Sequence, residues 1–98
     1  MLALKFLVAE DEPGVARTIR RALMPHGFVE VVETAADARE RLAERSYDAL
    51  VADVGLPDGS GLDLVAEATA EDDGLLALIV SGRVDPDRLA EAYQLGVS

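Results

Sequence analysis

The chain has 98 residues, half of them hydrophobic, and this length and composition indicate one globular domain with a single core. Its 19 acidic residues outnumber its 9 basic residues and give a formal charge of −10, which disfavours binding of nucleic acid or an anionic membrane by this chain alone. It has no cysteine, which excludes disulfides and thiolate zinc sites and is compatible with a reducing, cytoplasmic location.

The first predicted elements are a strand and a helix. The apolar run Leu4–Ala9 is typical of a strand buried on both faces, and it is too short for a signal peptide or a membrane span. Pro13 fits the first position of a helix. The apolar residues of this helix recur at helical spacing and are Val15, Ile19, Ala22 and Leu23. Pro25 and Gly27 end the helix.

A second strand and a second helix follow. Phe28–Glu33 predicts a strand, and its alternation of apolar and polar residues favours a place near the edge of a sheet. Thr34 and Asp37 resemble a capping box, in which a hydroxyl accepts from a backbone N–H three residues later. They predict the start of a helix that carries Ala38 and Leu42.

The third strand and third helix repeat this pattern. Tyr47–Asp53 is almost continuously apolar and predicts another strand buried on both faces. Ser60 and Asp63 have the spacing of a second capping box. The helix that they begin carries Leu62, Val65 and Thr69.

The last predicted elements complete an alternation of four strands and four helices. Leu75–Ser81 predicts the fourth strand, and a fourth helix is expected to begin at Asp85, carry Leu89 and Tyr93, and end at Gly96. Short connections and right-handed crossovers favour an α/β fold with an open, mostly parallel doubly wound sheet of strand order 2-1-3-4.

Polar residues lie at the carboxyl ends of three predicted strands. Glu10 and Asp11 follow the first strand, Asp53 ends the third, and Ser81 ends the fourth and precedes Gly82. In the order 2-1-3-4 the first and third strands are neighbours. We therefore expect the three carboxylates in one crevice, with the serine hydroxyl on the next strand.

Three carboxylates in one crevice repel one another. Two of them about 5 Å apart, at an effective dielectric constant of about 20, repel by roughly 3 kcal/mol. A divalent cation removes this repulsion, and oxygen ligands without a nearby His or Cys favour Mg²⁺ or Mn²⁺ over zinc. The same cation would orient a phosphoryl donor so that the Asp53 carboxylate attacks phosphorus.

Each of these features also has a purely structural explanation. Asp11 or Glu12 would cap the helix that begins at Pro13. Asp53 would be a solvated acid at a strand end, Ser81 would be structural, and LPDGSG would be an ordinary turn. Because these residues fall together at three strand ends, a functional site is favoured over these separate explanations.

The ordered set of motifs resembles the receiver domain of two-component response regulators over the whole chain. FLVAEDEPGV resembles the first strand and acid pair of that family, and DALVADVGLPDGSGLDL resembles its phosphoacceptor strand and following loop. LIVSGR resembles the strand that ends in the switch residue, and AYQLGVS resembles the helix end before a fifth strand. The resemblance implies a cytoplasmic signalling domain with the flavodoxin-like sheet order 2-1-3-4.

The resemblance also implies roles for the acidic residues. Asp53 would accept a phosphoryl group from a histidine kinase or phosphotransfer protein, and the resulting switch would control an output domain or protein. Asp11, with Glu10 directly or through water, would hold Mg²⁺ or Mn²⁺ together with Asp53 and the backbone carbonyl of Gly55. Such a domain is a regulatory phosphoacceptor, not an enzyme, although it assists its own phosphorylation and dephosphorylation.

The end of the chain carries further expectations. The resemblance implies that the Ser81 hydroxyl, as the switch residue, and the Gly82 amide bind a phosphoryl oxygen. The family continues past the position of Gly96 into a fifth strand, a phosphate-binding Lys and a fifth helix, and this sequence stops at Ser98. We therefore expect residues 1–98 to be a receiver domain that is incomplete at its C-terminus, with an open sheet edge that favours dimerisation.

Two other functions stay open on the sequence alone. The absent Lys is compatible with a pseudo-receiver that binds a protein partner without phosphotransfer. A Mg²⁺-dependent phosphatase with an Asp nucleophile is less favoured, because such enzymes need a second acid two residues after the nucleophile, and Gly55 stands there. The sequence names neither the kinase nor the output.

Overall fold

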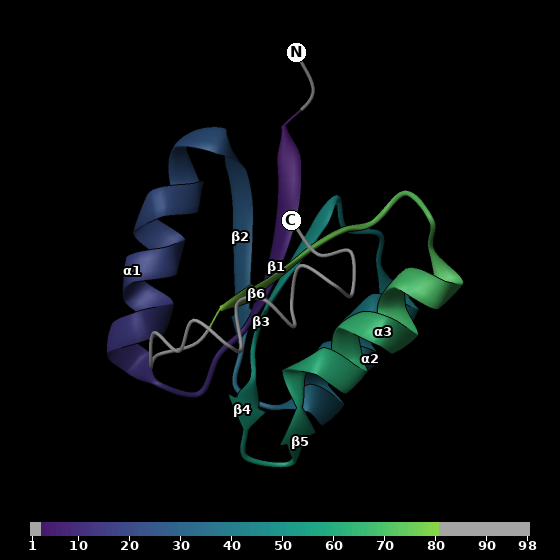
Figure 1. Cartoon of the computed structure of the whole chain (residues 1–98). Helices are drawn as coiled ribbons and strands as arrows, with labels where there is room; N and C mark the ends of the chain where they lie inside the picture. The colour runs from purple at the N-terminus through teal and green to yellow at the C-terminus, as the bar shows by residue number, and fades with distance from the viewer. Residues whose placement is uncertain (1–2, 81–98) are drawn as a thin grey trace.

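A computed structural model describes residues 3–80 of the chain, which form a parallel sheet between helices (Figure 1). Helix α1 lies on one side of the sheet, and α2 and α3 lie on the other. The elements in chain order are β1 (Leu4–Ala9), α1 (Pro13–Leu23), a 3₁₀ turn (Met24–His26), β2 (Gly27–Val32), α2 (Ala35–Glu44), β3 (Ala49–Asp53), β4 (Gly55–Leu56), β5 (Gly59–Ser60), α3 (Gly61–Glu71) and β6 (Leu76–Val80).

The strand order confirms the predicted α/β fold. The main sheet has the order β2-β1-β3-β6 with every pairing parallel, which is the predicted order 2-1-3-4 because β6 is the fourth strand of this sheet. Strand β2 lies at an edge, as its alternating pattern predicted. Strands β4 and β5 form a separate antiparallel hairpin, whereas the sequence indicated only a turn there.

The helix starts follow the predicted caps with one difference. The Thr34 hydroxyl accepts a hydrogen bond from the Asp37 N–H at 3.0 Å, as expected for the first half of a capping box. At the start of α3, the Ser60 hydroxyl accepts from the Leu62 N–H at 3.1 Å, and not from the N–H of Asp63 as the capping-box spacing predicted. Both hydroxyls satisfy a helix N–H that would otherwise lack a partner.

Three strand starts differ from prediction by one or two residues: β6 begins at Leu76 instead of Leu75, and β2 and β3 differ for local reasons. Strand β2 begins at Gly27, one residue early, because its backbone closely approaches β1: a Cβ at this position would lie 2.1 Å from the Leu4 carbonyl oxygen. Strand β3 begins at Ala49, after Asp48, whose carboxylate accepts from the Lys5 N–H at 2.7 Å. At the start of the pairing between β1 and β3, the Asp48 carboxylate thus takes the place of a backbone carbonyl as the acceptor for the Lys5 N–H.

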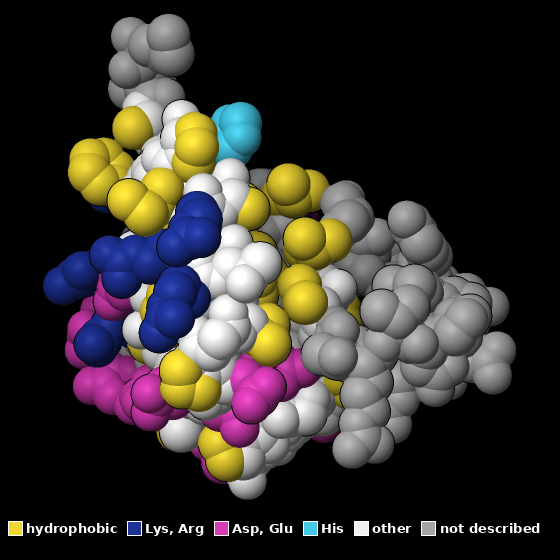
Figure 2. Space-filling view, turned by 90° about the vertical axis from the view of Figure 1, so that its left-hand side faces the viewer, with side chains coloured by type: hydrophobic (Ala, Val, Ile, Leu, Met, Phe, Trp, Pro, Cys, Tyr) yellow, Lys and Arg dark blue, Asp and Glu magenta, His cyan; other side chains and the backbone are white. Residues whose placement is uncertain are grey.

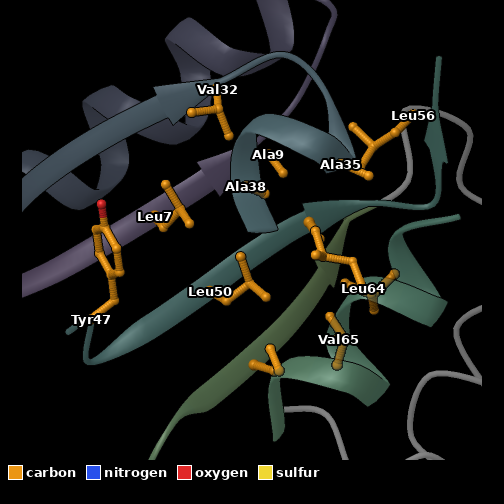
Figure 3. Packing of buried hydrophobic residues seen from close by; sticks show 14 of the residues in the cluster. Leu7, Ala9, Val32, Ala35, Ala38, Tyr47, Leu50, Leu56, Leu64 and Val65 are labelled. Atoms are coloured by element: carbon orange, nitrogen blue, oxygen red, sulfur yellow. The ribbon is translucent and has the colours of Figure 1, made fainter. Parts of the chain in front are cut away.

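The main core fills the space between the sheet and helices α2 and α3 (Figure 3). Leu7, Leu50 and Leu64 are fully buried there, and Ala35 and Ala38 allow α2 to approach the sheet closely. Small and branched aliphatic residues therefore build this core, as the low aromatic content predicted.

Among the described residues, the opposite face of the sheet is buried at the central strands, where Val8 and Val51 lie, and is less completely covered at β6. Helix α1 has no fully buried residue, and side chains alternate between the two faces along a strand. On β6, Ala77 and Ile79 face the core, while Leu76 and Leu78 on the other face are 55% and 42% exposed. The predicted fourth helix lies outside the described residues.

Charge is unevenly distributed over the surface. The side of the molecule that carries α1 shows Lys and Arg side chains gathered above a band of Asp and Glu side chains (Figure 2). Arg17, Arg20 and Arg21 on α1 are exposed. Among the described residues, no helix is long and apolar enough to cross a bilayer.

Candidate functional site

Neighbouring strands β1 and β3 bring three acidic residues together. The two strands pair in parallel with Ala9 opposite Ala52, so Glu10 and Asp53 follow these residues at the same edge of the sheet. Asp11 comes next along the chain, immediately before α1. Carboxylate oxygens of Glu10, Asp11 and Asp53 all lie within 4.8 Å of one another. The three acids that the sequence predicts to lie together are therefore close together in the structure.

Glu10 is the buried member of this group. Its backbone N–H donates to the Val32 carbonyl at 2.9 Å, which continues the pairing of β1 with β2 and fixes the residue below the surface. The side chain is only 3% exposed, and its Oε2 atom has no hydrogen-bond partner among the described residues. Burial, hydrogen bonding with Asp53 and the charges of Asp53 and Asp11 raise the pKa of Glu10 to about 8.

These features fit a hard divalent cation. A buried carboxylate oxygen without a partner is costly unless a proton or a positive charge compensates it. The three side chains offer only oxygen ligands, which Mg²⁺ and Mn²⁺ prefer. His26, the one histidine of the chain, lies beyond the opposite end of α1, about 16 Å of helix away. The donor set therefore favours magnesium or manganese over zinc.

Asp53 is held by a tight backbone arrangement at the end of β3. It lies opposite Val80 of β6 in the sheet. On its other side α3 begins so close that a Cβ at Gly61 would lie 1.9 Å from the Asp53 carbonyl oxygen. The Gly61 N–H donates to the Val54 carbonyl at 3.1 Å. Only glycine fits at this close approach, which explains the glycine in the loop motif.

The remaining predicted site residues are placed in part. Gly55 lies two residues beyond Asp53, is exposed, and pairs with Ser60 in the β4–β5 hairpin. Its carbonyl is near the acidic group in sequence, and its role as a ligand stays a prediction. Ser81 and Gly82 lie outside the described residues.

The contacts do not support helix capping as the role of Asp11 or Glu12. Glu12 occupies the N-cap position of α1, but its side chain makes no capping hydrogen bond. Among the described residues, the Asp11 side chain likewise makes no hydrogen bond to the helix. Both side chains are exposed. Asp11 and Glu12 therefore do not serve as side-chain caps for α1.

Sequence reasoning missed a fourth acidic residue near the site. Asp58, at the tip of the β4–β5 hairpin, accepts from the Ala35 N–H at 2.7 Å and from the Ala36 N–H at 2.9 Å. These two donors belong to the first turn of α2, and they hold the pKa of Asp58 below its usual value. The partners are 23 and 22 residues away in sequence, so no local pattern indicates this contact.

Comparisons with known proteins agree on one family. The sequence profile of the response regulator receiver domain matches residues 6–98. The transcriptional regulatory protein CreB of Escherichia coli is 36% identical over 84 residues, which are 84% of this chain and 37% of CreB. The transcriptional regulatory protein KdpE of Mycobacterium tuberculosis is 33% identical over 94 residues, which are 92% of this chain and 40% of KdpE.

Solved structures agree with the fold. A beryllofluoride-activated DrrB receiver domain superposes with a TM-score of 0.86 at 20% identity, covering 98% of this chain and 80% of the other. The non-phosphorylated HemR receiver domain of Leptospira biflexa has a TM-score of 0.82 at 25% identity, covering 97% of this chain and 77% of the other. The chain spans little more than a third of the length of curated relatives such as CreB, at 37%.

Proposed function

The chain belongs to the family of response regulator receiver domains, and we propose that it is the phosphoacceptor domain of a two-component system, with Asp53 as the acceptor. The observation that carries this proposal is the placement of Asp53 beside the buried, unpartnered carboxylate oxygen of Glu10. The buried Glu10 oxygen beside Asp53 favours binding of a cation. Asp53 itself is only partly buried, so a phosphoryl donor can reach its carboxylate.

The proposed chemistry is transfer of one phosphoryl group. An oxygen of the Asp53 carboxylate attacks phosphorus, and a new phosphorus–oxygen bond forms. The bond from phosphorus to the donor breaks; when the donor is a phosphohistidine that is protonated on its other ring nitrogen, the bonding electrons stay on the ring, which leaves as neutral imidazole. The product is an aspartyl phosphate. Glu10 and Asp11 stay unmodified in this proposal.

Glu10, Asp11 and Asp53, with the carbonyl of Gly55, would hold Mg²⁺ or Mn²⁺. The cation, when bound, would neutralise negative charge on the carboxylates and the transferring phosphoryl group. The buried oxygen of Glu10 supports this assignment, because it has no partner among the described residues. Ser81, through its hydroxyl, and Gly82, through its amide, would bind a phosphoryl oxygen and transmit the modification.

The proposed partners follow from the family. A histidine kinase or phosphotransfer protein would supply the phosphoryl group, and an output domain or protein would respond to it. The curated relatives CreB and KdpE are named transcriptional regulatory proteins, and this chain covers 37% and 40% of them, so most of each relative has no counterpart in this chain. A cytoplasmic location and a single receiver domain over residues 1–98 are part of the same proposal.

The test is incubation with acetyl phosphate and Mg²⁺, followed by intact mass measurement and a phosphate-release assay over time. The proposal predicts one phosphoryl group per chain and slow release. No adduct, with an intact fold, would instead favour the pseudo-receiver that binds a partner without phosphotransfer. Rapid release over many turnovers would favour an aspartate-dependent phosphatase.

A further inference from the structure

The β4–β5 hairpin is attached to helix α2 through one side chain. Both carboxylate oxygens of Asp58 are used, because Oδ1 accepts from the Ala35 N–H at 2.7 Å and Oδ2 accepts from the Ala36 N–H at 2.9 Å. The first N–H groups of a helix have no partner within the helix, and a carboxylate satisfies them with a favourable charge. The contact therefore joins the loop that follows Asp53 to a separate element.

Apolar packing supports the same attachment. Leu56, on the hairpin, is buried and belongs to the core cluster that contains Ala35 at the start of α2. Figure 3 shows the Leu56 side chain beside Ala35. The hairpin is therefore held against the first turn of α2 by the packing of Leu56 beside Ala35 and by the two hydrogen bonds of Asp58.

The hairpin would be mobile without this attachment. It contains Gly55 and Gly59, and the space around both is open, since an added Cβ would meet nothing within 4 Å. Glycine leaves the backbone with more conformational freedom than any other residue. Its pairing consists of two residues on each strand, and a two-stranded hairpin alone is marginally stable in water. Packing and hydrogen bonds to α2 must therefore supply much of its order.

We infer that Asp58 is a positioning residue for the metal site: by clamping the hairpin onto α2 it fixes the Gly55 backbone beside the three carboxylates. This inference rests on the proposed function, because Gly55 matters there as a cation ligand. Asp58 touches neither the cation nor the phosphoryl group. It acts through the backbone between itself and Asp53, which has only four intervening residues.

Thr34 provides a matched control for this role. Its hydroxyl accepts from the Asp37 N–H at 3.0 Å, so Thr34→Ala weakens the same helix N-terminus without touching the hairpin. A purely structural role of Asp58, as a cap for α2, predicts that Asp58→Ala and Thr34→Ala behave alike. A positioning role predicts that they differ in Mg²⁺ affinity although both lower the melting temperature.

The experiment is an NMR titration with Mg²⁺ alone, followed through the backbone amides of the hairpin. We expect Asp58→Ala to raise the dissociation constant about tenfold, at the lower end of the effect seen when residues that support metal ligands are removed. Thr34→Ala leaves it unchanged. Asp58→Asn, which keeps one acceptor oxygen, gives an intermediate value and serves if the alanine variant does not fold. Hydrogen exchange of the hairpin amides speeds up in the Asp58 variants only.

The outcomes separate this inference from the proposed function. If the parent chain binds Mg²⁺ and Asp58→Ala binds it equally well, the inference is wrong and the proposed function stands. Equal weakening in Asp58→Ala and Thr34→Ala would also overturn it, because helix stability would then explain both. A parent chain without Mg²⁺ binding overturns both.

Discussion

Ionising the buried Glu10 carboxyl is the largest electrostatic cost at the site. Its carboxyl is almost completely buried, and the neighbouring acids Asp53 and Asp11 oppose its ionisation. A proton or a cation relieves this strain, so the protonation of Glu10 and the binding of metal should compete. This competition can be followed by measuring the free energy of unfolding with and without metal at several pH values.

The first prediction concerns pH. The pKa of Glu10 is raised from 4.5 to about 8, so the fold keeps its proton where the unfolded chain has lost it. The free energy of unfolding without metal therefore falls as pH rises from about 4.5 to about 8 through this group. Glu10→Gln removes this component and raises metal-free stability at neutral pH, while it weakens Mg²⁺ binding. Urea unfolding at several pH values, with and without Mg²⁺, measures this.

A pH profile that is the same in the parent chain and in Glu10→Gln would contradict this account of Glu10.

Mg²⁺ should also raise the melting temperature of the parent chain, because a ligand that binds only the folded state stabilises it by roughly 1.4 kcal/mol at about tenfold excess over its dissociation constant. Asp53→Asn should likewise increase metal-free stability and reduce the response to Mg²⁺. Glu10, Asp11 and Asp53 form a metal site only if Mg²⁺ stabilises the parent chain and each substitution weakens that stabilisation.

The second prediction concerns Gly61. A Cβ at this position would lie 1.9 Å from the Asp53 carbonyl oxygen, so Gly61→Ala must displace either Asp53 or the start of α3. We expect a loss of about 1–3 kcal/mol in the free energy of unfolding, as for overpacking, together with weaker Mg²⁺ binding. Gly14→Ala is the control, because nothing lies within 4 Å of a Cβ there and alanine favours helix. Equal stability of the two variants would refute this reading of the close approach.

Among the elements, β2, α2 and the segment before β3 are connected by a partly buried polar network. Glu30 accepts from the Tyr47 hydroxyl at 2.6 Å and from Arg41 Nε at 2.5 Å, and Arg45 lies 3.6 Å away. The hydrogen bond from Tyr47 and the charges of the two arginines lower the pKa of Glu30. Burial and the contact with Glu30 raise the pKa of Tyr47 to about 12.

The third prediction follows from this network. Because the pKa of Glu30 is lowered in the fold, its contribution is present at neutral pH and is lost as pH falls through the folded pKa. Glu30→Gln should cost on the order of 1 kcal/mol at neutral pH and less in acid, and high salt should reduce the difference. Thermal melts of both proteins at pH 7 and at acidic pH test this. A larger effect of the substitution in acid would contradict the prediction.

Local sequence patterns predicted the elements where local chemistry decides them. Pro13 marks the first residue of α1, and Thr34 caps α2 through the Asp37 N–H. At the β4–β5 hairpin local sequence predicts only a turn, because the order of the hairpin depends on Leu56 packing against α2 and on Asp58 bonding to that helix. Such contacts join residues far apart in the chain, and one sequence carries no local sign of them.

The acidic site was predictable for a different reason. Once the strand order is assigned, the residues at the ends of neighbouring parallel strands must meet, so Glu10 and Asp53 follow from topology. Their burial does not follow from topology. Glu10 is fully covered while Asp11, the next residue, is exposed, and this difference arises from packing around the end of β1.

At the scale of the whole molecule, the exposed apolar face of β6 has a consequence. Among the described residues β6 is an edge strand of the sheet, and Leu76 and Leu78 on it are about half exposed. Apolar sheet edges pair with other chains because their backbone groups lack partners. The charge of −10 opposes association, but it is screened beyond about 8 Å at physiological salt.

The fourth prediction is that the chain of 98 residues dimerises or aggregates more readily at physiological salt than at low salt. Leu76→Lys with Leu78→Glu should reduce self-association of the 98-residue chain. Light scattering with size exclusion measures this, and a monodisperse monomer at both salt concentrations would contradict it.

The central claim, that Asp53 is the phosphoacceptor beside a cation site, is tested most directly by locating the modification. The chain is treated with acetyl phosphate with or without Mg²⁺, reduced with borohydride to convert the acyl phosphate to a stable product, and sequenced by fragment mass spectrometry. We predict modification at Asp53 alone and only with Mg²⁺, lost in Asp53→Ala and kept in Asp63→Asn, whose side chain is exposed on α3. Modification at another residue, or an adduct that survives Asp53→Ala, would contradict the account.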